Sequence, residues 1–426
     1  MIGPGAMMRR PAALLVCVFI AALVSMGPAP AGQRASEGGD AWVATWAAAP
    51  QLTEPANLPP APGFADATLR QVVHVSIGGR RIRIRFSNAF GRAALTLQAA
   101  RVARAAGGSV TLAATDRALT FRGRASVTIP EGALILSDPL DFDLPPLSDL
   151  AVTARLTDTP ADVTGHPGSR TTSYLQAGDA MAAAEFGAAV RIEHWYFLSG
   201  VEVVANGAAR AVAILGDSIT DGRGSTTDGN DRWPDNLARR LQAAGPTKQV
   251  AVLNLGIGGN RLLRDGLGPN ALARLDRDVL AQPGVRWLIV FEGINDIGTA
   301  SAAQAKGEPA ATAEDIIGAY EQIVDRAHAL GVRVYGATIM PFEGFAYGNY
   351  FTPEAEARRQ TINAWIRTSG RFDAVIDFDA VTRDPERPSR LSAAVDGGDH
   401  LHPSAAGYRI MADAIDLALF ATPPKR

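Results

Sequence analysis

Short stretches of alternating polar and apolar residues run through the first half of the chain. Arg80–Phe86 alternates strictly, and Gln71–Ile77 does so less regularly, with Gly78-Gly79 between the two stretches. Such alternation predicts half-buried strands, and a Gly-Gly pair between two of them predicts a hairpin. Four more short runs lie among prolines and glycines: Leu95–Val102, Ser126–Ile129, Leu150–Leu156 and His194–Val204. We therefore expect residues 42–205 to form an all-β, sandwich-like or jelly-roll-like domain.

The pattern changes in the second half of the chain. Ala211–Leu215 is an uninterrupted apolar run, which is typical of a strand buried on both faces. Four similar runs follow: Val250–Leu255, Trp287–Phe291, Val332–Thr338 and Ala374–Phe378. Between the runs, Ile316–Leu330 keeps helical spacing and ends at Gly331, and Pro234 suits a first helical position. Alternating strands and helices predict an α/β domain over residues 206–426, with a parallel sheet covered on both faces.

The N-terminal segment has the pattern of a signal peptide. Arg9-Arg10 precedes the uncharged run Ala12–Val24, and Ala29-Pro30-Ala31 offers small residues for cleavage near Ala31. The run is shorter than the roughly 20 residues of a membrane-spanning helix, so we favour removal over anchoring. We expect a signal peptide over residues 1–31, a polar linker over 32–41, and a secreted or periplasmic protein without stable membrane insertion.

Composition narrows the classes of partner and chemistry. The chain has 426 residues, which suits two domains, and its formal net charge is −2, from 41 Lys+Arg and 43 Asp+Glu. That balance gives no electrostatic reason to expect nucleic acid or an anionic membrane as a partner. The single cysteine, Cys17, lies in the predicted signal peptide. The mature chain would therefore have neither a thiol nucleophile nor a thiolate zinc site.

Polar, glycine-rich segments follow the first three buried runs, and a fourth precedes the last helical segment. They are Gly216–Gly222, Asn254–Asn260, Glu292–Asp296 and Asp399–Pro403. Reactive groups of open α/β sheets gather at the carboxyl ends of the strands. We therefore expect these four segments to face one crevice.

The residue types in these segments suit acyl transfer through a serine. Ser218 opens a helix after a strand, and His402 is the base that would take its proton. Asp399 lies one turn before His402 and would orient the imidazole. The oxyanion of a tetrahedral intermediate needs hydrogen-bond donors. The N–H groups of Ser218 and Gly259 and the side-chain amide of Asn295 could supply them.

The choice of histidine rests on its neighbours. Only His402 has an aspartate three residues before it and a proline after it. His400, two residues away, is the main alternative. The other four histidines are outside the glycine-rich strand exits: His74, His166, His194 and His328.

Two further residues are candidates for contact with the substrate. Asp217 is expected to hold its turn by bonding local N–H groups, and it also lies next to the predicted nucleophile. Arg261 would reach the crevice and bind a substrate oxygen, or else be an ordinary surface arginine.

Together the four segments resemble the blocks of SGNH hydrolases, also called GDSL esterases, in the family's order. The resemblance implies that Ser218, Gly259, Asn295 and His402 are the four signature residues and that Asp399 completes the triad. It also implies a flavodoxin-like α/β/α sandwich, acyl ester substrates and no cofactor. The resemblance covers residues 208–420.

Within this family, the chain resembles the subgroup of arylesterases and xylan-associated acylhydrolases. The segments Gly216–Gly222 and Gly258–Leu263 look like this subgroup, and so does the N-terminal β domain that starts with Trp42-Val-Ala-Thr-Trp46. The resemblance implies short acyl groups, acetyl above all, on a small molecule or a polysaccharide.

Other functions stay open at this point. An arylesterase or short-chain lipase would use the same mechanism. A metal-dependent phosphoesterase would use Asp217, Asn295, Asp296, His400 and His402 as ligands, although we expect no metal site. A carbohydrate-binding protein with an idle hydrolase site is the alternative from a non-enzymatic class.

Overall fold

A computed structural model describes residues 1, 3, 41–205, 207 and 209–422. The predicted signal peptide, apart from two isolated positions, and nearly all of the predicted linker lie outside the described residues. Within the described part, no helix is both long and apolar enough to span a bilayer.

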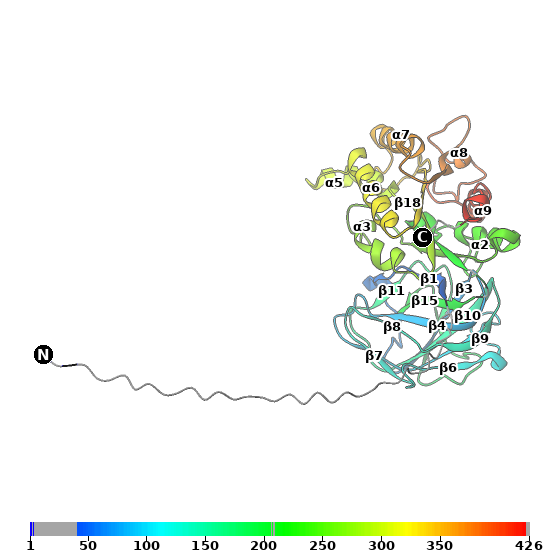
Figure 1. Ribbon diagram of the computed structural model, residues 1–426. Coiled ribbons are helices and arrows are strands. Elements are labelled where there is room, and N and C mark those ends of the chain that lie inside the picture. The colour runs from blue at the N-terminus through cyan, green and yellow to red at the C-terminus, as the bar shows by residue number, and fades with distance from the viewer. Residues whose placement is uncertain (2, 4–40, 206, 208, 423–426) are drawn as a thin grey trace, which may run out of the picture. The chain divides into compact units, whose positions relative to one another are not determined.

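A five-stranded parallel sheet forms the second half of the fold (Figure 1). Its strands are β16 (Arg210–Gly216), β17 (Val250–Gly256), β18 (Val285–Phe291), β19 (Arg333–Ala337) and β20 (Ala374–Ile376). Their spatial order is β17-β16-β18-β19-β20, with every pair parallel. This 2-1-3-4-5 order is that of flavodoxin-like sheets. The predicted α/β fold class is confirmed.

Helices cover both faces of this sheet. They bury apolar side chains against the sheet and against one another. α2 (Trp233–Ala243) packs on β17 and on α9 (Ala405–Asp413), and α6 (Ala313–Ala329) packs on β19 and on α7 (Pro353–Thr368). Figure 1 shows the two pairs on opposite sides of β18. The other α- and π-helical segments are short: α1 (Ser218–Asp221), α3 (Ala271–Arg274), the π-helix Leu275–Leu280, α4 (Ile294–Gly298), α5 (Ala300–Ala305) and α8 (Phe378–Thr382). Short 3-10 helices form at Pro55–Asn57, Ala113–Thr115, Gly245–Thr247 and Leu417–Phe420.

Helix ends follow the local signals, with small shifts. Thr312 caps α6 by accepting a hydrogen bond from the N–H of Asp315, and Gly331 follows the helix with φ 69°. α2 begins at Trp233, so Pro234 occupies the second helical position instead of the predicted first.

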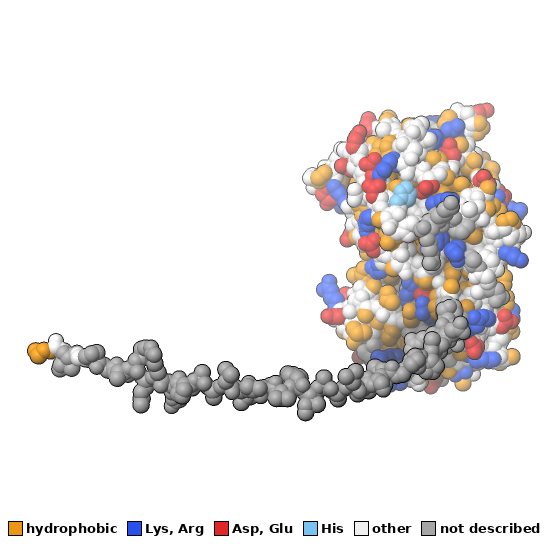
Figure 2. Space-filling model, viewed as in Figure 1, with side chains coloured by type: hydrophobic (Ala, Val, Ile, Leu, Met, Phe, Trp, Pro, Cys, Tyr) orange, Lys and Arg blue, Asp and Glu red, His pale blue; other side chains and the backbone are white. Residues whose placement is uncertain are grey.

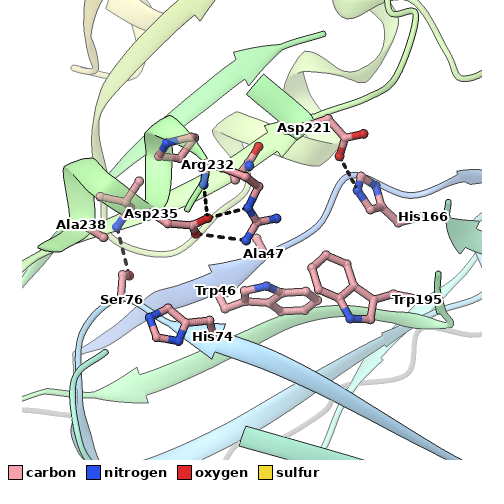
Figure 3. A pocket seen from close by; sticks show the side chains of 13 residues that line it. Trp46, Ala47, His74, Ser76, His166, Trp195, Asp221, Arg232, Asp235 and Ala238 are labelled. Atoms are coloured by element: carbon pink, nitrogen blue, oxygen red, sulfur yellow. Dashed lines mark hydrogen bonds and ion pairs between the residues drawn. The ribbon is translucent and has the colours of Figure 1, made fainter. Parts of the chain in front are cut away.

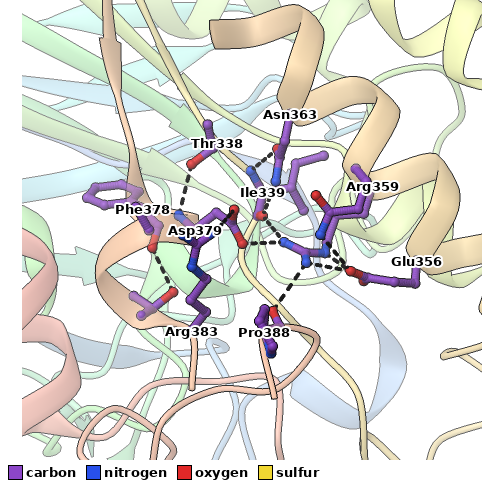
Figure 4. Close-up of polar contacts among 12 residues, drawn as sticks. Thr338, Ile339, Glu356, Arg359, Asn363, Phe378, Asp379, Arg383 and Pro388 are labelled. Carbon is purple, nitrogen blue, oxygen red and sulfur yellow. Dashed lines mark hydrogen bonds and ion pairs between the residues drawn. The ribbon is translucent and has the colours of Figure 1, made fainter. Parts of the chain in front are cut away.

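A buried arginine fixes α7 to the end of the sheet (Figure 4). Arg359 is fully buried, and its guanidinium bonds Asp379 at 2.6 Å and Glu356 at 2.7 Å. It also donates to the carbonyl oxygen of Ile339, beyond β19, at 2.9 Å. A buried charge needs such partners, and here they connect α7, α8 and the segment that follows β19.

The first half of the fold consists of antiparallel sheets. The five-stranded sheet contains β1 (Trp42–Ala47), β15 (Leu198–Val204), β4 (Gly79–Ser87), β8 (Leu134–Leu136) and β9 (Leu140–Leu144). The seven-stranded sheet contains β13 (Val190–Ile192), β12 (Ser173–Ala177), β3 (Ala67–Val75), β10 (Ser148–Leu156), β5 (Leu95–Arg104), β6 (Arg117–Leu119) and β7 (Val127–Ile129). A small third sheet joins β14 (Trp195–Tyr196), β11 (Thr164–His166) and β2 (Gln51–Leu52). The predicted β-rich region is confirmed.

The predicted hairpin at Gly78-Gly79 is wrong. β3 pairs with β10 and β12, whereas β4 pairs with β15, β8 and β9, so the chain passes from one sheet to the other. Neither glycine has the positive φ that a tight hairpin turn needs. A Cβ atom at Gly78 would lie 2.3 Å from O of Leu144, and one at Gly79 would lie 2.7 Å from O of Val204. Both positions therefore require glycine, because a side chain would clash with the backbone packed against them.

Hydrogen bonds join the antiparallel sheets to the parallel one. The N–H of Val252 in β17 donates to Oγ of Ser76 at 3.0 Å, and the N–H of Ala44 in β1 donates to O of Pro283 at 3.0 Å. On the face shown in Figure 2, basic and acidic side chains are interspersed. That surface fits the formal charge of −2.

Candidate active site

The segment after β16 presents a serine at the carboxyl edge of the sheet. Asp217 caps α1, because its Oδ1 accepts a hydrogen bond from the N–H of Ile219 at 2.9 Å. Gly216 is needed before it, since a Cβ atom there would lie 2.2 Å from Oγ1 of Thr220. Ser218 is therefore the first residue of α1 and lies next to the point where the strand order reverses, where ligands of such sheets bind.

Ser218, His402 and Asp399 form one hydrogen-bonded chain. Oγ of Ser218 lies 2.9 Å from Nε2 of His402, and Nδ1 of His402 lies 2.7 Å from Oδ2 of Asp399. A carboxylate only accepts hydrogen bonds, so Nδ1 carries the proton and Nε2 accepts from the serine hydroxyl. Ser218 is 8% exposed and His402 5%. The structure thus brings together three residues that the sequence placed in one crevice.

Asp399 is fixed as an anion. Its Oδ1 accepts from the N–H groups of Leu401 at 3.0 Å and His402 at 2.8 Å. Burial alone would raise the pKa of this carboxyl, but the hydrogen bonds from the ring and backbone of His402 and from the backbone of Leu401 lower it well below its ordinary value. The carboxylate stays ionised and keeps the imidazole in one tautomer and orientation.

The alternative histidines lie elsewhere. His400 is half exposed and pairs with Asp396 through Nδ1. The other four form hydrogen bonds with residues other than Ser218: His74 with Asp149, His166 with Asp221, His194 with the carbonyl of Pro167, and His328 with Asp373. No group of three or more His, Cys, Asp or Glu residues in the described ranges could hold a metal ion.

The predicted oxyanion donors lie on segments that pack around α1. The N–H of Ile257 donates to O of Gly216 at 3.0 Å, which places the glycine-rich loop of β17 beside the serine turn. Nδ2 of Asn295 donates to O of Asn260 in that loop at 2.9 Å. An amide nitrogen has two hydrogens, so one N–H of Asn295 remains. Asn295 is 8% exposed.

Residues 214–410 match the model of the GDSL-like lipase/acylhydrolase family. The match spans just under half of the chain. Together with the hydrogen-bonded chain of Ser218, His402 and Asp399, it supports a serine ester hydrolase that acts on acyl esters. No curated protein matches the chain.

Solved structures similar to the chain include a variant of an acetyl xylan esterase from Geobacillus stearothermophilus. It is 23% identical, with 52% of this chain and 98% of that chain covered and a TM-score of 0.39. A GDSL-like lipase from Bacteroides thetaiotaomicron is 19% identical, with 49% and 87% covered and a TM-score of 0.37.

A tyrosine that the sequence analysis missed orients the amide of this GDSL-like site. The hydroxyl of Tyr350 donates towards Oδ1 of Asn295 at 2.8 Å, and O of Ile294 lies 3.1 Å away. Gly298 leaves room for the ring, since a Cβ atom there would lie 2.1 Å from it. Because Oδ1 is held by Tyr350, Nδ2 must point the other way. Tyr350 lies 55 positions after Asn295 in irregular chain, and no motif indicates it.

Arg274 is a second site residue that the sequence did not indicate, and its guanidinium contacts groups at the carboxyl ends of three strands. Its guanidinium donates to O of Leu255 at 2.6 Å and to O of Gly216 at 3.0 Å, and it lies 3.3 Å from Oε1 of Glu292. These groups end β17 and β16 and follow β18, so one fully buried cation fixes the floor of the site.

Three buried carboxyls with raised pKa values lie in this part of the site. Burial raises the pKa of Asp217 to about 7, the pKa of Asp296 to about 6, and the pKa of Glu292 well above its usual range. Asp296 also accepts hydrogen bonds from the N–H groups of Leu262 at 2.8 Å and Leu263 at 3.2 Å, which hold the glycine-rich loop. Neighbouring carboxylates disfavour one another's charge, so this cluster makes stability depend on pH.

Arg261 and Asp217 differ in their access to solvent. Nη2 of Arg261 donates to O of Asp265, and its Nε has no hydrogen-bond partner among the described residues. Burial raises the pKa of Asp296, and the nearby guanidinium of Arg261 partly opposes that rise. Asp217 is buried and bonds its own turn. Contact of either residue with substrate stays a prediction.

The β region contacts the serine turn through His166, the last residue of β11. Nε2 of His166 lies 2.9 Å from Oδ1 of Asp221, in α1, as Figure 3 shows. Oδ2 of Asp221 is 3.6 Å from Nη2 of Arg170. A Cβ atom at Gly168 would lie 1.8 Å from Oδ2 of Asp221, so only glycine fits there. These contacts join residues far apart in sequence, and short-range patterns do not predict them.

Proposed function

We propose that the chain is a secreted or periplasmic serine esterase that removes short acyl groups, acetyl above all, from carbohydrate. Ser218 is the nucleophile, His402 the general base and Asp399 the orienting carboxylate. The observation that carries this proposal is the 2.9 Å contact between Oγ of Ser218 and Nε2 of His402, with Asp399 behind the imidazole. The signal-peptide pattern before Ala31 supports the location.

Both half-reactions, acylation of Ser218 and hydrolysis of the acyl-enzyme, follow from this geometry. Nε2 of His402 takes the hydroxyl proton as Oγ of Ser218 attacks the carbonyl carbon of the ester. The imidazolium is stabilised by Asp399, whose carboxylate stays ionised. His402 then gives the proton to the leaving alcohol, which departs and leaves an acyl group on Ser218. Water attacks this acyl-enzyme with His402 again as base, and the acid and free serine are released.

The oxyanion is stabilised by three donors. The N–H groups of Ser218 and Gly259 donate no hydrogen bond to another residue that the structure describes. The third donor is the remaining N–H of Asn295, oriented by Tyr350. Donors of this kind act on the transition state more than on the bound ester, and losing one typically costs ~2.7–4 kcal/mol of transition-state stabilisation.

The surroundings of His402 support a ring-shaped alcohol. Since His402 protonates the leaving group, side chains beside it flank the alcohol. The ring of Phe345 meets the imidazole edge-on, with centroids 6.2 Å apart, and Tyr347 in the same loop is 76% exposed. Exposed aromatic faces pack well on the C–H faces of sugar rings, or on an aryl alcohol. These aromatic side chains therefore support an arylesterase as well as a carbohydrate esterase.

Substrate comparison tests the proposal. We would measure kcat/KM for acetylated xylan oligosaccharides, phenyl acetate, and p-nitrophenyl acetate, butyrate and octanoate. We expect acetate to exceed octanoate and acetylated xylan to exceed phenyl acetate. A preference for octanoate contradicts the short acyl group, and a preference for phenyl acetate favours the arylesterase.

Two serine variants test the mechanism. Ser218→Ala should lower kcat at least about a thousandfold, because no other group replaces the nucleophile. Ser225→Ala is the matched control, since Ser225 lies in the same segment and bonds only the carbonyl of Gly222. Full turnover by Ser218→Ala would reject the mechanism.

A further inference from the structure

A cavity of about 210 Å³ lies between the seven-stranded sheet and the loop that follows α1. Its volume equals that of about seven water molecules in the liquid, which is room for one small ring. The polar side chains that line it include His74, Asp149, Tyr174, Arg191, Asp228 and Asn230. None of them belongs to the catalytic machinery described above.

The acceptors of this cavity are held in place. Oδ1 of Asp149 lies 2.7 Å from Nδ1 of His74. Both oxygens of Asp228 accept hydrogen bonds from Thr172, from its N–H at 2.6 Å and from its hydroxyl at 2.7 Å. Fixed polar groups give directed recognition because little order is lost when a ligand binds.

Donors are present as well. Arg191 lines the cavity, and its guanidinium forms no hydrogen bond or ion pair with any residue in the described ranges. The amide of Asn230 is only loosely engaged, with Nδ2 3.5 Å from Oδ1 of Asp149. The ring of Tyr174 and the side chain of Val72 add an apolar wall.

The balance of charge indicates the class of ligand. The carboxylates of Asp149 and Asp228 would repel an anion, and the guanidinium of Arg191 would repel a cation. A neutral molecule with many hydroxyl groups satisfies both, because each hydroxyl donates and accepts. We propose that this cavity binds one unit of a neutral carbohydrate.

The cavity is within reach of the esterase site. A Cβ atom at Gly224 would lie 3.8 Å from Cβ of His402, and Asp228 follows four residues later. Four extended residues span at most about 14 Å. A saccharide chain acylated on one unit could therefore place another unit in the cavity while its ester faces Ser218. This link to catalysis rests on the proposed function, whereas the binding itself does not.

Calorimetry with unacetylated xylotetraose tests the inference. Ala105 lines the cavity, and Ala105→Trp would fill it, whereas Ala106→Trp changes the exposed neighbour that does not line it. We expect Ala105→Trp and Arg191→Ala to weaken xylotetraose binding about tenfold, and Ala106→Trp to leave it within about twofold. Turnover of p-nitrophenyl acetate should stay unchanged in all three variants, which shows that they are folded.

The binding result and the catalytic result can fail separately. Ser218→Ala should abolish hydrolysis and keep xylotetraose affinity. Retained hydrolysis in that variant rejects the proposed function and leaves the binding inference standing. No saturable binding of xylotetraose, equal binding by Ala105→Trp and the wild-type chain, or binding of tetragalacturonate alone overturns the inference.

Discussion

Nε2 of His166 lies 2.9 Å from Oδ1 of Asp221, and Nδ1 of the same ring lies 2.9 Å from O of Ala49. The pair of His166 and Asp221 is buried on both sides. It connects β11 to the helix that begins with Ser218.

Removing His166 should destabilise the protein. His166→Ala removes the hydrogen-bond partner of the buried carboxylate of Asp221 and leaves Arg170 3.6 Å from it; breaking a buried pair in this way typically costs ~3–5 kcal/mol. Urea unfolding measures the change in the free energy of unfolding. His328→Ala is the matched control, because His328 forms an exposed pair with Asp373 and should cost at most about 1 kcal/mol. Equal free energies of unfolding for the two variants would show that the buried pair stabilises the protein no more than the exposed pair does.

Tyr350→Phe should slow the chemical step without weakening substrate binding. The ring still fits beside Gly298, but Oδ1 of Asn295 loses its donor and the amide is freer to rotate. We expect kcat to fall about tenfold and KM to stay within about twofold, because the oxyanion donor acts in the transition state. Steady-state kinetics on p-nitrophenyl acetate measure both values.

Tyr335→Phe is the control for this variant. Its hydroxyl also bonds a carbonyl, that of Leu419 at 2.6 Å, but away from Asn295. It should leave kcat unchanged. A loss confined to KM in Tyr350→Phe, or an equal loss of kcat in both variants, would contradict the orienting role.

The buried carboxyls predict a pH dependence of stability. Asp217 and Asp296 have pKa values raised to about 7 and about 6, so the folded state keeps protons that the unfolded chain loses above about pH 4. The free energy of unfolding should therefore fall as the pH rises from about 4 to about 7. Asp217→Asn keeps the cap on Ile219 but cannot ionise, so its decline should be shallower.

A surface carboxyl provides the comparison. The backbone N–H of Gly123, the hydroxyl of Thr120 and the backbone N–H of Arg122 lower the pKa of Asp138, so above about pH 5 it is ionised in both the folded and the unfolded state. Asp138→Asn should leave the slope between about pH 5 and 7 unchanged. If Asp217→Asn has the wild-type slope in urea titrations, burial of Asp217 is not the cause of the decline.

The parallel sheet and the main site residues were predictable because their signals are local. A strand buried on both faces needs an uninterrupted apolar run, and Ala211–Leu215 shows it and becomes β16. Ser218, Asn295 and His402 lie in short segments next to such elements. The carboxyl ends of parallel strands meet at one edge, so the segments had to converge.

Contacts between distant segments were not predictable in this way. Gly78-Gly79 has the composition of a hairpin turn, yet close contact with the carbonyls of Leu144 and Val204 explains its glycines. His166 and Tyr350 act through partners dozens of residues away. No periodicity or spacing in the chain encodes those pairs, because only packing brings them together.

Covalent labelling tests the central claim most directly. A fluorophosphonate reacts with a serine only where a base activates the hydroxyl and donors hold the oxyanion. Mass spectrometry of the labelled protein should find one adduct, on Ser218, and none in Ser218→Ala. An adduct on another residue, or labelling that persists in Ser218→Ala, would contradict the account.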